Sequence, residues 1–308
     1  MLHAFSDETG EEKFAIVPEN FVPEVKTLAD SHRFYVDADA MAADVWFPSE
    51  DSDSFKDFDE WKTVLMAAQG EGGRGITCLD VTDPDALPPT LLFSLYDTNN
   101  IGYTTSVPLV YKIRRIVGAN TVERFFAFFG GGEWPDSMYN IYSPGSDVRG
   151  NVIVAVDVQD AANNVLAEGS NFWYIPAVTE DASKMVYPYA SAATVVNLNS
   201  RVDNLYDLLY IPDLAGQLWK VDLSDSVVSN WEAKCIFQPV IPSDSSADSL
   251  WQPAFFAPLV EREPATGGLW LFYGTGDRAK IFKTPTDNRF YAILDNMTDS
   301  VMLTEDSF

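Results

Sequence analysis

The sequence predicts an all-β protein of the β-propeller class, and two observations lead to this prediction. A short pattern of alternating residues that ends in an acidic residue recurs along the 308 residues. Its copies end at Asp80, Asp157, Asp222 and Asp295, which lie 77, 65 and 73 positions apart, and a fifth copy at 2–6 ends in Ser. Apolar residues make up 46% and aromatic residues 13% of the chain, which is enough for a large core.

Each copy is typical of a short strand in a meander. Alternation places one face of the strand against a neighbouring sheet, and the terminal Asp is expected to accept backbone N–H groups in the following turn. Turn residues such as Thr82-Asp83-Pro84 follow most copies. Repeated sheets of four antiparallel strands describe a propeller, and four to five repeats predict four to five blades.

The remaining elements follow in chain order as short strands and turns. We expect strands at 2–6, 13–17, 31–37, 41–47 paired with 61–68, 76–81, 124–129 and 269–273, and structured loops at 49–60, 133–149 and 244–249.

A formal G-x-G-x-x-G match occurs at 70–75, but a strand pattern follows it. Dinucleotide binders need a helix there, because the phosphate sits at the helix N-terminus. These glycines therefore predict a hairpin turn that needs positive φ.

Charge and composition exclude several classes of protein. With 20 Lys and Arg against 46 Asp and Glu, the net charge of −26 opposes binding to nucleic acid or anionic lipid. A solvated surface suited to a saline or extracellular setting is one interpretation, and a surface that uses divalent cations is the other. Cys78 and Cys235 are too few for a disulfide framework or a zinc site.

No segment has the length and apolarity of a membrane span, so we expect no membrane insertion. The chain opens inside a repeat strand, without the sheet that such a strand must pair with, and without a signal-peptide pattern. We therefore expect a C-terminal piece of a longer protein whose export signal lies upstream.

Catalytic motifs are missing from the sequence. His3 and His32 are the two histidines, and neither lies in a nucleophile or H-E-x-x-H motif. We therefore expect a protein that is not an enzyme.

Several segments, in the same order, resemble the C-terminal propeller of PilY-type type IV pilus tip adhesins, and they span nearly the whole chain, 1–308. They are M-L-H-A-F-S-D-E-T-G-E-E at 1–12, H-R-F-Y-V-D at 32–37, W-K-T-V-L at 61–65, G-I-T-C-L-D-V-T-D-P at 75–84, D-L-A-G-Q-L-W-K-V-D at 213–222, F-Y-G-T-G-D at 272–277 and R-F-Y-A-I-L-D at 289–295.

The resemblance implies an extracellular protein at the pilus tip that supports pilus biogenesis and retraction, surface adhesion and twitching motility. Its implied partners are minor pilins at the pilus tip and a surface or host ligand. The family propeller is similar to quinoprotein propellers in shape and has more blades than the repeats found here, so the fold expected for this chain is an incomplete propeller.

The resemblance also implies a calcium loop, with oxygen ligands at positions one, three, five and nine and a backbone carbonyl at seven. These positions fall on Asn199, Arg201, Asp203, Leu205 and Asp207. Calcium prefers six to eight oxygen ligands, and the guanidinium of Arg201 departs from the pattern because it repels a cation. Two alternatives stay open: a loop that binds calcium, and an ion-free loop in which Arg201 neutralises the two carboxylates.

Three aromatic residues in the loop at 133–149 are expected to be exposed and are candidate contact residues, because amphipathic rings contribute strongly to interfaces. They are Trp134, Tyr139 and Tyr142. An alternative function is a periplasmic or surface scaffold for assembly. A quinone-cofactor dehydrogenase is a weaker alternative, since that family needs adjacent cysteines and those of this chain are 157 positions apart.

Overall fold

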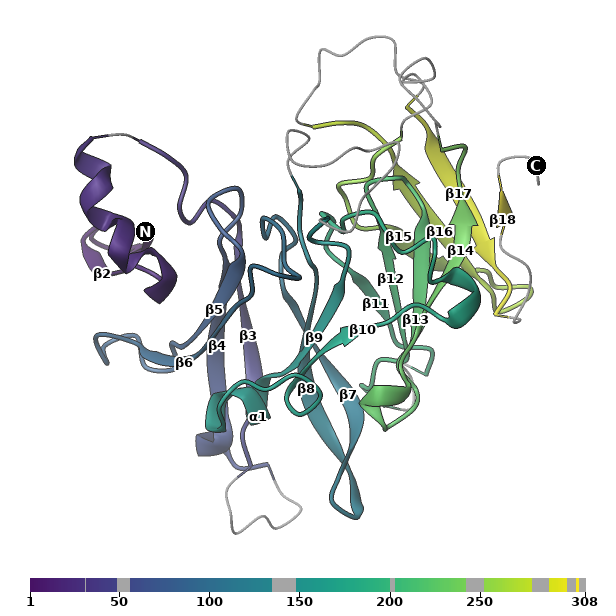
Figure 1. Cartoon of the computed structure of the whole chain (residues 1–308). Helices are drawn as coiled ribbons and strands as arrows, with labels where there is room; N and C mark the ends of the chain where they lie inside the picture. Colours follow the sequence, from purple (N-terminus) through teal and green to yellow (C-terminus); the bar gives the residue numbers. More distant parts are fainter. Residues whose placement is uncertain are drawn as a thin grey trace.

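The computed structural model describes residues 1–30, 32–48, 56–134, 148–199, 203–241, 252–278, 288–297 and 303–304. The described chain folds into a row of antiparallel sheets that stand side by side in sequence order (Figure 1). The row does not close on itself: the N-terminal hairpin lies at one side of the molecule and the last sheet at the other (Figure 1). This arrangement confirms the prediction of an incomplete propeller.

A two-stranded hairpin and four larger sheets make up the row. The hairpin pairs β1 (Leu2–Phe5) with β2 (Glu12–Ile16). The first sheet contains β3 (Ala40–Trp46), β4 (Trp61–Ala68), β5 (Gly75–Asp80) and β6 (Thr90–Tyr96). The second contains β7 (Leu109–Val117), β8 (Asn120–Gly130), β9 (Ile153–Asp157) and β10 (Phe172–Ile175).

The third sheet contains β11 (Thr194–Val196), β12 (Leu208–Pro212), β13 (Leu218–Asp222) and β14 (Ala233–Gln238), and β18 (Leu303–Thr304) adds to it parallel to β14. The fourth contains β15 (Leu259–Arg262), β16 (Leu269–Gly274) and β17 (Phe290–Asp295). Short helices join the strands: η1 (Glu19–Ala29), η2 (Phe58–Glu60), α1 (Val158–Asn163), η3 (Thr179–Asp181) and η4 (Val228–Asn230).

The repeated pattern occupies the same place in each of the four larger sheets. Strands β5, β9, β13 and β17 are each the third strand in chain order, and β1 is the fifth copy. The predicted bond from the following turn to the terminal side chain is present in all five copies. The donors are the N–H groups of Thr82, Asp160, Ser224, Met297 and Thr9, and the acceptors are Asp80, Asp157, Asp222, Asp295 and Ser6.

The strand predicted at 31–37 is wrong. The described residues 32–37 are irregular and follow η1. Asp37 donates its N–H to the carbonyl of Gln69, at 3.2 Å, and the ring of Tyr35 packs edge-on against Phe21. The backbone of this segment therefore makes a hydrogen bond at the start of the glycine turn rather than pairing with a neighbouring strand.

The glycine turn at 70–75 connects β4 and β5, as predicted. Gly70 has φ of 58° and opens the turn. Thr104 accepts the N–H of Gln69 on its Oγ1 at 2.9 Å, so this segment docks on the next stretch of chain. The structure confirms a hairpin turn at this motif.

Alternation along β8 explains why the sheets stack. Phe125 and Phe129 join the apolar cluster shared with the first sheet, whereas Phe126 and Phe128 join the cluster shared with the third sheet. Phe126 lies 5.4 Å from Trp231 between ring centroids. A third cluster joins the third and fourth sheets. Because the second sheet is covered on both faces here, the second half of β8 and most of β9 are continuously apolar.

The turn between β12 and β13 is fixed by a buried carboxylate. Asp213 is fully buried, and its Oδ1 accepts the N–H groups of Ala215 and Gln217 while its Oδ2 accepts the indole N–H of Trp219 at 2.9 Å. Gly216 has φ of 78°, and a Cβ there would lie 2.4 Å from the carbonyl oxygen of Gln252. A side chain at this position is therefore excluded by both conformation and space.

Among the described residues, no helix is both long and apolar enough to cross a membrane.

Replacing Phe126 by Ala should destabilise the fold strongly, because the ring is fully buried between two sheets. We expect a loss of about 3–5 kcal/mol in the free energy of unfolding, measured by urea denaturation. Phe290→Ala is the matched control, since Phe290 is 72% exposed, and it should cost less than about 1 kcal/mol. Equal losses would show that the sheets do not depend on this layer.

Gly216→Ala and Gly169→Ala separate strain from steric clash. Both glycines have φ of 78°, but a Cβ at Gly169 would meet no atom within 4 Å. We expect Gly169→Ala to cost about 1–2 kcal/mol, the penalty of a left-handed residue, and Gly216→Ala to cost clearly more. Thermal unfolding of the two variants measures the difference, and indistinguishable melting temperatures would contradict the expected clash with Gln252.

Candidate functional site

The loop before β12 is organised around Asp203. Its Oδ1 accepts the N–H of Leu205 at 3.1 Å, and its own N–H donates to the carbonyl of Asn199 at 3.1 Å. The side-chain amide of Asn197 donates to the carbonyl of Asp203 at 2.9 Å. These bonds fold the described residues of the loop into a compact turn and leave Oδ2 of Asp203 for another partner.

Asp207 anchors the loop to the third sheet. Its Oδ2 accepts the N–H of Leu198 at 2.8 Å, and its backbone N–H donates to the carbonyl of Val196 in β11. Its carbonyl accepts the N–H of Leu223, just after β13. The side chain is only 7% exposed, so its second oxygen faces other groups of the protein more than it faces water.

A guanidinium from the second sheet faces both carboxylates. Arg114, on β7, donates from Nη2 to Oδ2 of Asp203 at 2.7 Å, and its Nη1 lies 3.8 Å from Oδ1 of Asp207. This cation comes from 89 positions earlier in the sequence. Sequence reasoning missed it, because nothing in the local pattern around Arg114 indicates its partners.

The predicted calcium ligands are thus partly brought together. Asn199, Asp203, Leu205 and Asp207 belong to one turn, and Arg201 lies outside the described residues. Among the described residues of the loop, the geometry does not fit a calcium ion, because the guanidinium of Arg114 holds the outer oxygen of one carboxylate and faces that of the other. Within the described part of the chain, no group of three or more His, Cys, Asp and Glu side chains could hold a metal ion.

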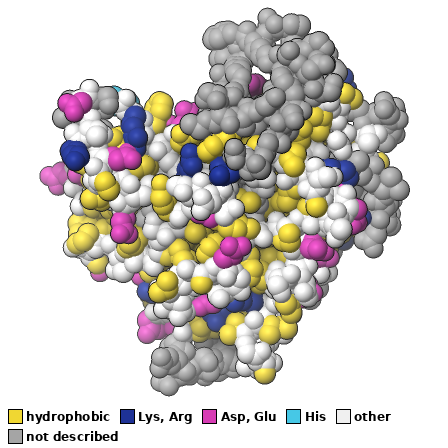
Figure 2. All heavy atoms as spheres, viewed as in Figure 1, with side chains coloured by type: hydrophobic (Ala, Val, Ile, Leu, Met, Phe, Trp, Pro, Cys, Tyr) yellow, Lys and Arg dark blue, Asp and Glu magenta, His cyan; other side chains and the backbone are white. Residues whose placement is uncertain are grey.

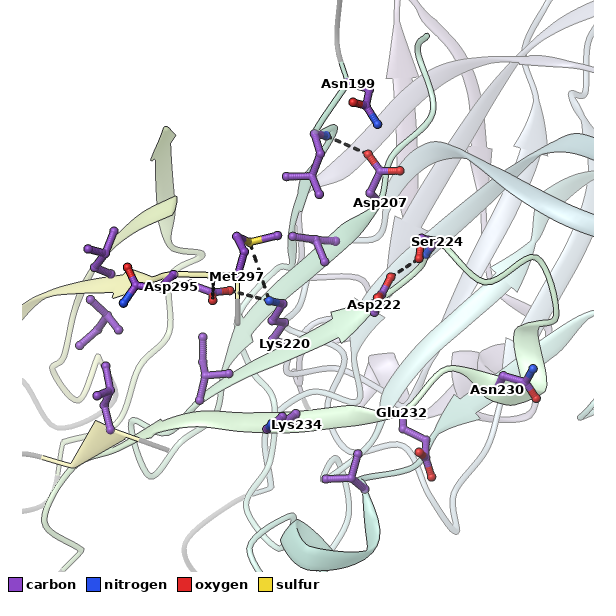
Figure 3. Close-up of a pocket in the computed structure, with 18 of the residues that line it drawn as sticks. Asn199, Asp207, Lys220, Asp222, Ser224, Asn230, Glu232, Lys234, Asp295 and Met297 are labelled. Carbon is purple, nitrogen blue, oxygen red and sulfur yellow. Dashed lines mark hydrogen bonds and ion pairs between the residues drawn. The ribbon is translucent and has the colours of Figure 1, made fainter. Parts of the chain in front are cut away.

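A cleft of about 610 Å³ opens beside this loop, between the third and fourth sheets (Figure 3). Asn199 and Asp207 lie at one end, and further charged groups come from β13, β14 and β17 and from the residue before β14 (Figure 3). These groups are Lys220, Asp222, Glu232, Lys234 and Asp295. The walls carry both acidic and basic side chains, so the cleft does not present a single sign of charge.

The charged centre of the cleft joins the two sheets. Lys220 of β13 donates to Oδ2 of Asp295 in β17 at 2.7 Å (Figure 3). The same oxygen accepts the hydroxyl of Tyr210 at 2.7 Å. Burial alone raises the pKa of Asp295, but the bonds from Lys220 and Tyr210 outweigh it and hold the pKa below its ordinary value. This carboxylate is therefore ionised at neutral pH and acts as a structural partner of Lys220.

The predicted contact residues divide into two groups. Trp134 is only 8% exposed, and the guanidinium of Arg74 lies 4.4 Å from its ring centroid, so the expectation of an exposed contact residue is wrong there. The arginine covers one face of the ring. Tyr139 and Tyr142 lie outside the described residues.

A partly exposed aromatic cluster occurs instead on the outer face of the fourth sheet. Trp270 stacks on Phe272 at 6.2 Å between centroids, and Phe272 stacks on Phe290 at 6.3 Å. Phe290 is 72% and Leu259 68% exposed. Alternation in the strands at 269–274 and 290–295 was the sequence signal for this cluster, since it places these residues on the face opposite the buried ones.

Acidic side chains are dispersed over the face shown in Figure 2 rather than gathered in one patch.

Comparison with known proteins places these features in context. No protein-family model matches the sequence. A type IV pilus biogenesis factor PilY1 homolog of Xylella fastidiosa (strain Temecula1) is 27% identical over 279 residues, which cover 90% of this chain and 19% of the relative. The type IV pilus biogenesis factor PilY1 of Pseudomonas aeruginosa (strain UCBPP-PA14) is 24% identical over 301 residues, covering 90% of this chain and 22% of the relative.

A solved structure shows the same fold. The crystal structure of the Pseudomonas aeruginosa PilY1 C-terminal domain superposes with a TM-score of 0.61 and 22% identity, over 96% of this chain and 55% of that chain. The homologues over about 90% of this chain are thus PilY1-type biogenesis factors, which confirms the resemblance found in the motifs. The chain spans about a fifth of the length of these curated relatives.

Asp295→Asn should weaken the joint between the third and fourth sheets. Because folding lowers the pKa of Asp295, the carboxylate contributes stability above its unfolded pKa, about 4, and that stability is lost as pH falls through the folded pKa. The variant should therefore lose about 1–3 kcal/mol at pH 7, and the difference from the unaltered chain should shrink in acid.

Urea denaturation between pH 3 and 7 measures this dependence. Asp222→Asn is the control, because Asp222 lies on the rim of the same cleft and bonds only the N–H of Ser224 among the contacts described. A pH-independent difference for Asp295→Asn, or an equal one for Asp222→Asn, would contradict the assignment.

Proposed function

We propose that this chain is the C-terminal propeller region of a type IV pilus biogenesis factor and supports pilus biogenesis and retraction without catalysing a reaction. The observation that carries the proposal is the similarity to PilY1 proteins over 90% of the chain, together with the fold shared with a PilY1 C-terminal domain. The relatives are named for a role in pilus biogenesis, and that role comes to this chain as a proposal because only about a fifth of their length is matched.

The proposed location is outside the cell, at the pilus tip, with minor pilins as partners. The strongly acidic composition supports a solvent-exposed location without nucleic acid partners, since a net charge of −26 repels polyanions. Adhesion to a surface and support of twitching motility belong to the same proposal, because both depend on pili that are assembled and retracted.

The mode of action is binding through loops that a rigid frame displays. The frame is the stack of sheets, whose joints are apolar layers reinforced by buried ion pairs such as Lys220 with Asp295. Tyr139 and Tyr142 are the proposed contact residues within the loop at 133–149. Trp134 is left out of this surface, since its ring is buried.

Deletion of the coding region for residues 1–308, in the organism that encodes the chain, tests the proposal. We expect fewer pili in sheared surface preparations and smaller twitching zones, both restored by a plasmid copy. Normal piliation together with normal motility in the deletion strain would contradict a role in pilus biogenesis.

A Tyr139→Ala/Tyr142→Ala double variant in the full-length protein separates an adhesin from an assembly scaffold. An adhesin should keep its surface pili and lose attachment to abiotic or host surfaces. A scaffold should instead lose pili, or attachment in proportion to pili. If piliation and attachment both stayed unchanged, these two residues would not be the contact surface.

A further inference from the structure

We infer that Arg114 is the built-in cation of the loop before β12, and that it takes the place of a calcium ion there. The inference stands on the geometry of this chain and is independent of the proposed role in pilus biogenesis. It concerns Asp203 and Asp207, whose outer oxygens lie 2.7 Å and 3.8 Å from the two terminal nitrogens of Arg114.

Each carboxylate divides its oxygens between the loop and the arginine. One oxygen of Asp203 accepts the N–H of Leu205, and one oxygen of Asp207 accepts the N–H of Leu198. The other oxygen of each faces Arg114. A guanidinium presents several donors in a planar fork, so one side chain can serve two carboxylates. Arg114 therefore neutralises one of the two negative charges of the loop without a divalent ion.

The arginine comes from a neighbouring sheet, and this distinguishes it from a ligand within the loop. Two further contacts bring β7 against the loop. The N–H of Tyr206 donates to the carbonyl of Lys112 at 3.0 Å, and the rings of Tyr111 and Tyr206 meet edge to face at 4.7 Å between centroids. Arg114 is thus held in position by its strand, and the ion pairs connect the second sheet to the third.

Burial decides how the arrangement responds to a free cation. The side chains of Asp207, Asp203 and Arg114 are 7%, 24% and 36% exposed. A calcium ion would have to displace the guanidinium and leave it facing a second positive charge. The loop should therefore keep the same conformation at any calcium concentration of the surroundings.

Thermal unfolding with calcium chloride as the probe tests the inference. The melting temperature of the unaltered chain should change by less than about 1 °C between 1 mM EDTA and about 5 mM calcium, since a ligand stabilises only a state that binds it. Arg114→Gln should lower the melting temperature by about 2–5 °C in EDTA, and calcium should recover part of this loss because the two carboxylates are then unpaired.

Arg262→Gln is the matched control. Arg262 touches the same loop, but it donates to the carbonyl of Leu198 at 3.1 Å rather than to the carboxylates. This variant removes the same charge and should not gain a response to calcium. A double variant, Arg114→Gln/Asp203→Asn, should lose little more than Arg114→Gln alone, because the two residues act as a pair.

Three results would overturn the inference. The first is a saturable rise in the melting temperature of the unaltered chain with calcium. The second is an Arg114→Gln variant that stays indifferent to calcium, which would show that the carboxylates do not form a cation site. The third is full additivity of Arg114→Gln and Asp203→Asn. If Arg114→Gln does not fold, the calcium titration of the unaltered chain and of Asp203→Asn still decides the question.

Discussion

The burial of both faces of each inner sheet is the constraint on which the rest of the structure depends. A strand such as β8 places Phe126 and Phe128 on one side and Phe125 and Phe129 on the other, so it needs a sheet on each side. Stacking in sequence order is the simplest way to supply these neighbours, because each joint then connects segments adjacent in the chain. The end sheets keep one face that the described residues leave partly exposed, as the ring of Phe290 shows.

Local features of the fold could be predicted from the sequence, and features that depend on distant partners could not. The terminal Asp of each repeat bonds a turn two or three residues away, so the pattern alone indicates the contact. The segment at 32–37 has the alternation of a strand, yet it docks on the turn at Gln69 and forms no ladder. Tertiary packing decides its partner, and alternation in the sequence does not predict that packing.

The candidate site divides in the same way. The sequence indicated that Asp203 and Asp207 belong to one turn, because their spacing is local. It did not indicate that Arg114 faces them, since register and stacking of two sheets bring that residue into place. It also suggested that Trp134 is exposed, whereas Arg74 covers the ring. In a chain with 20 basic and 46 acidic residues, several of the few cations lie at joints between strands or sheets, where a carboxylate is partly desolvated.

The two cysteines give the stack a property of its own. Cys78 is buried in the layer between the first and second sheets, and Cys235 in the layer between the second and third. Burial raises the pKa of both thiols, so neither forms a reactive thiolate while its layer is closed. Each of these two joints thus carries its own thiol, and opening of one of the two layers would expose one thiol without the other. The order in which Cys78 and Cys235 become accessible on heating or under force therefore shows which of these two joints opens first.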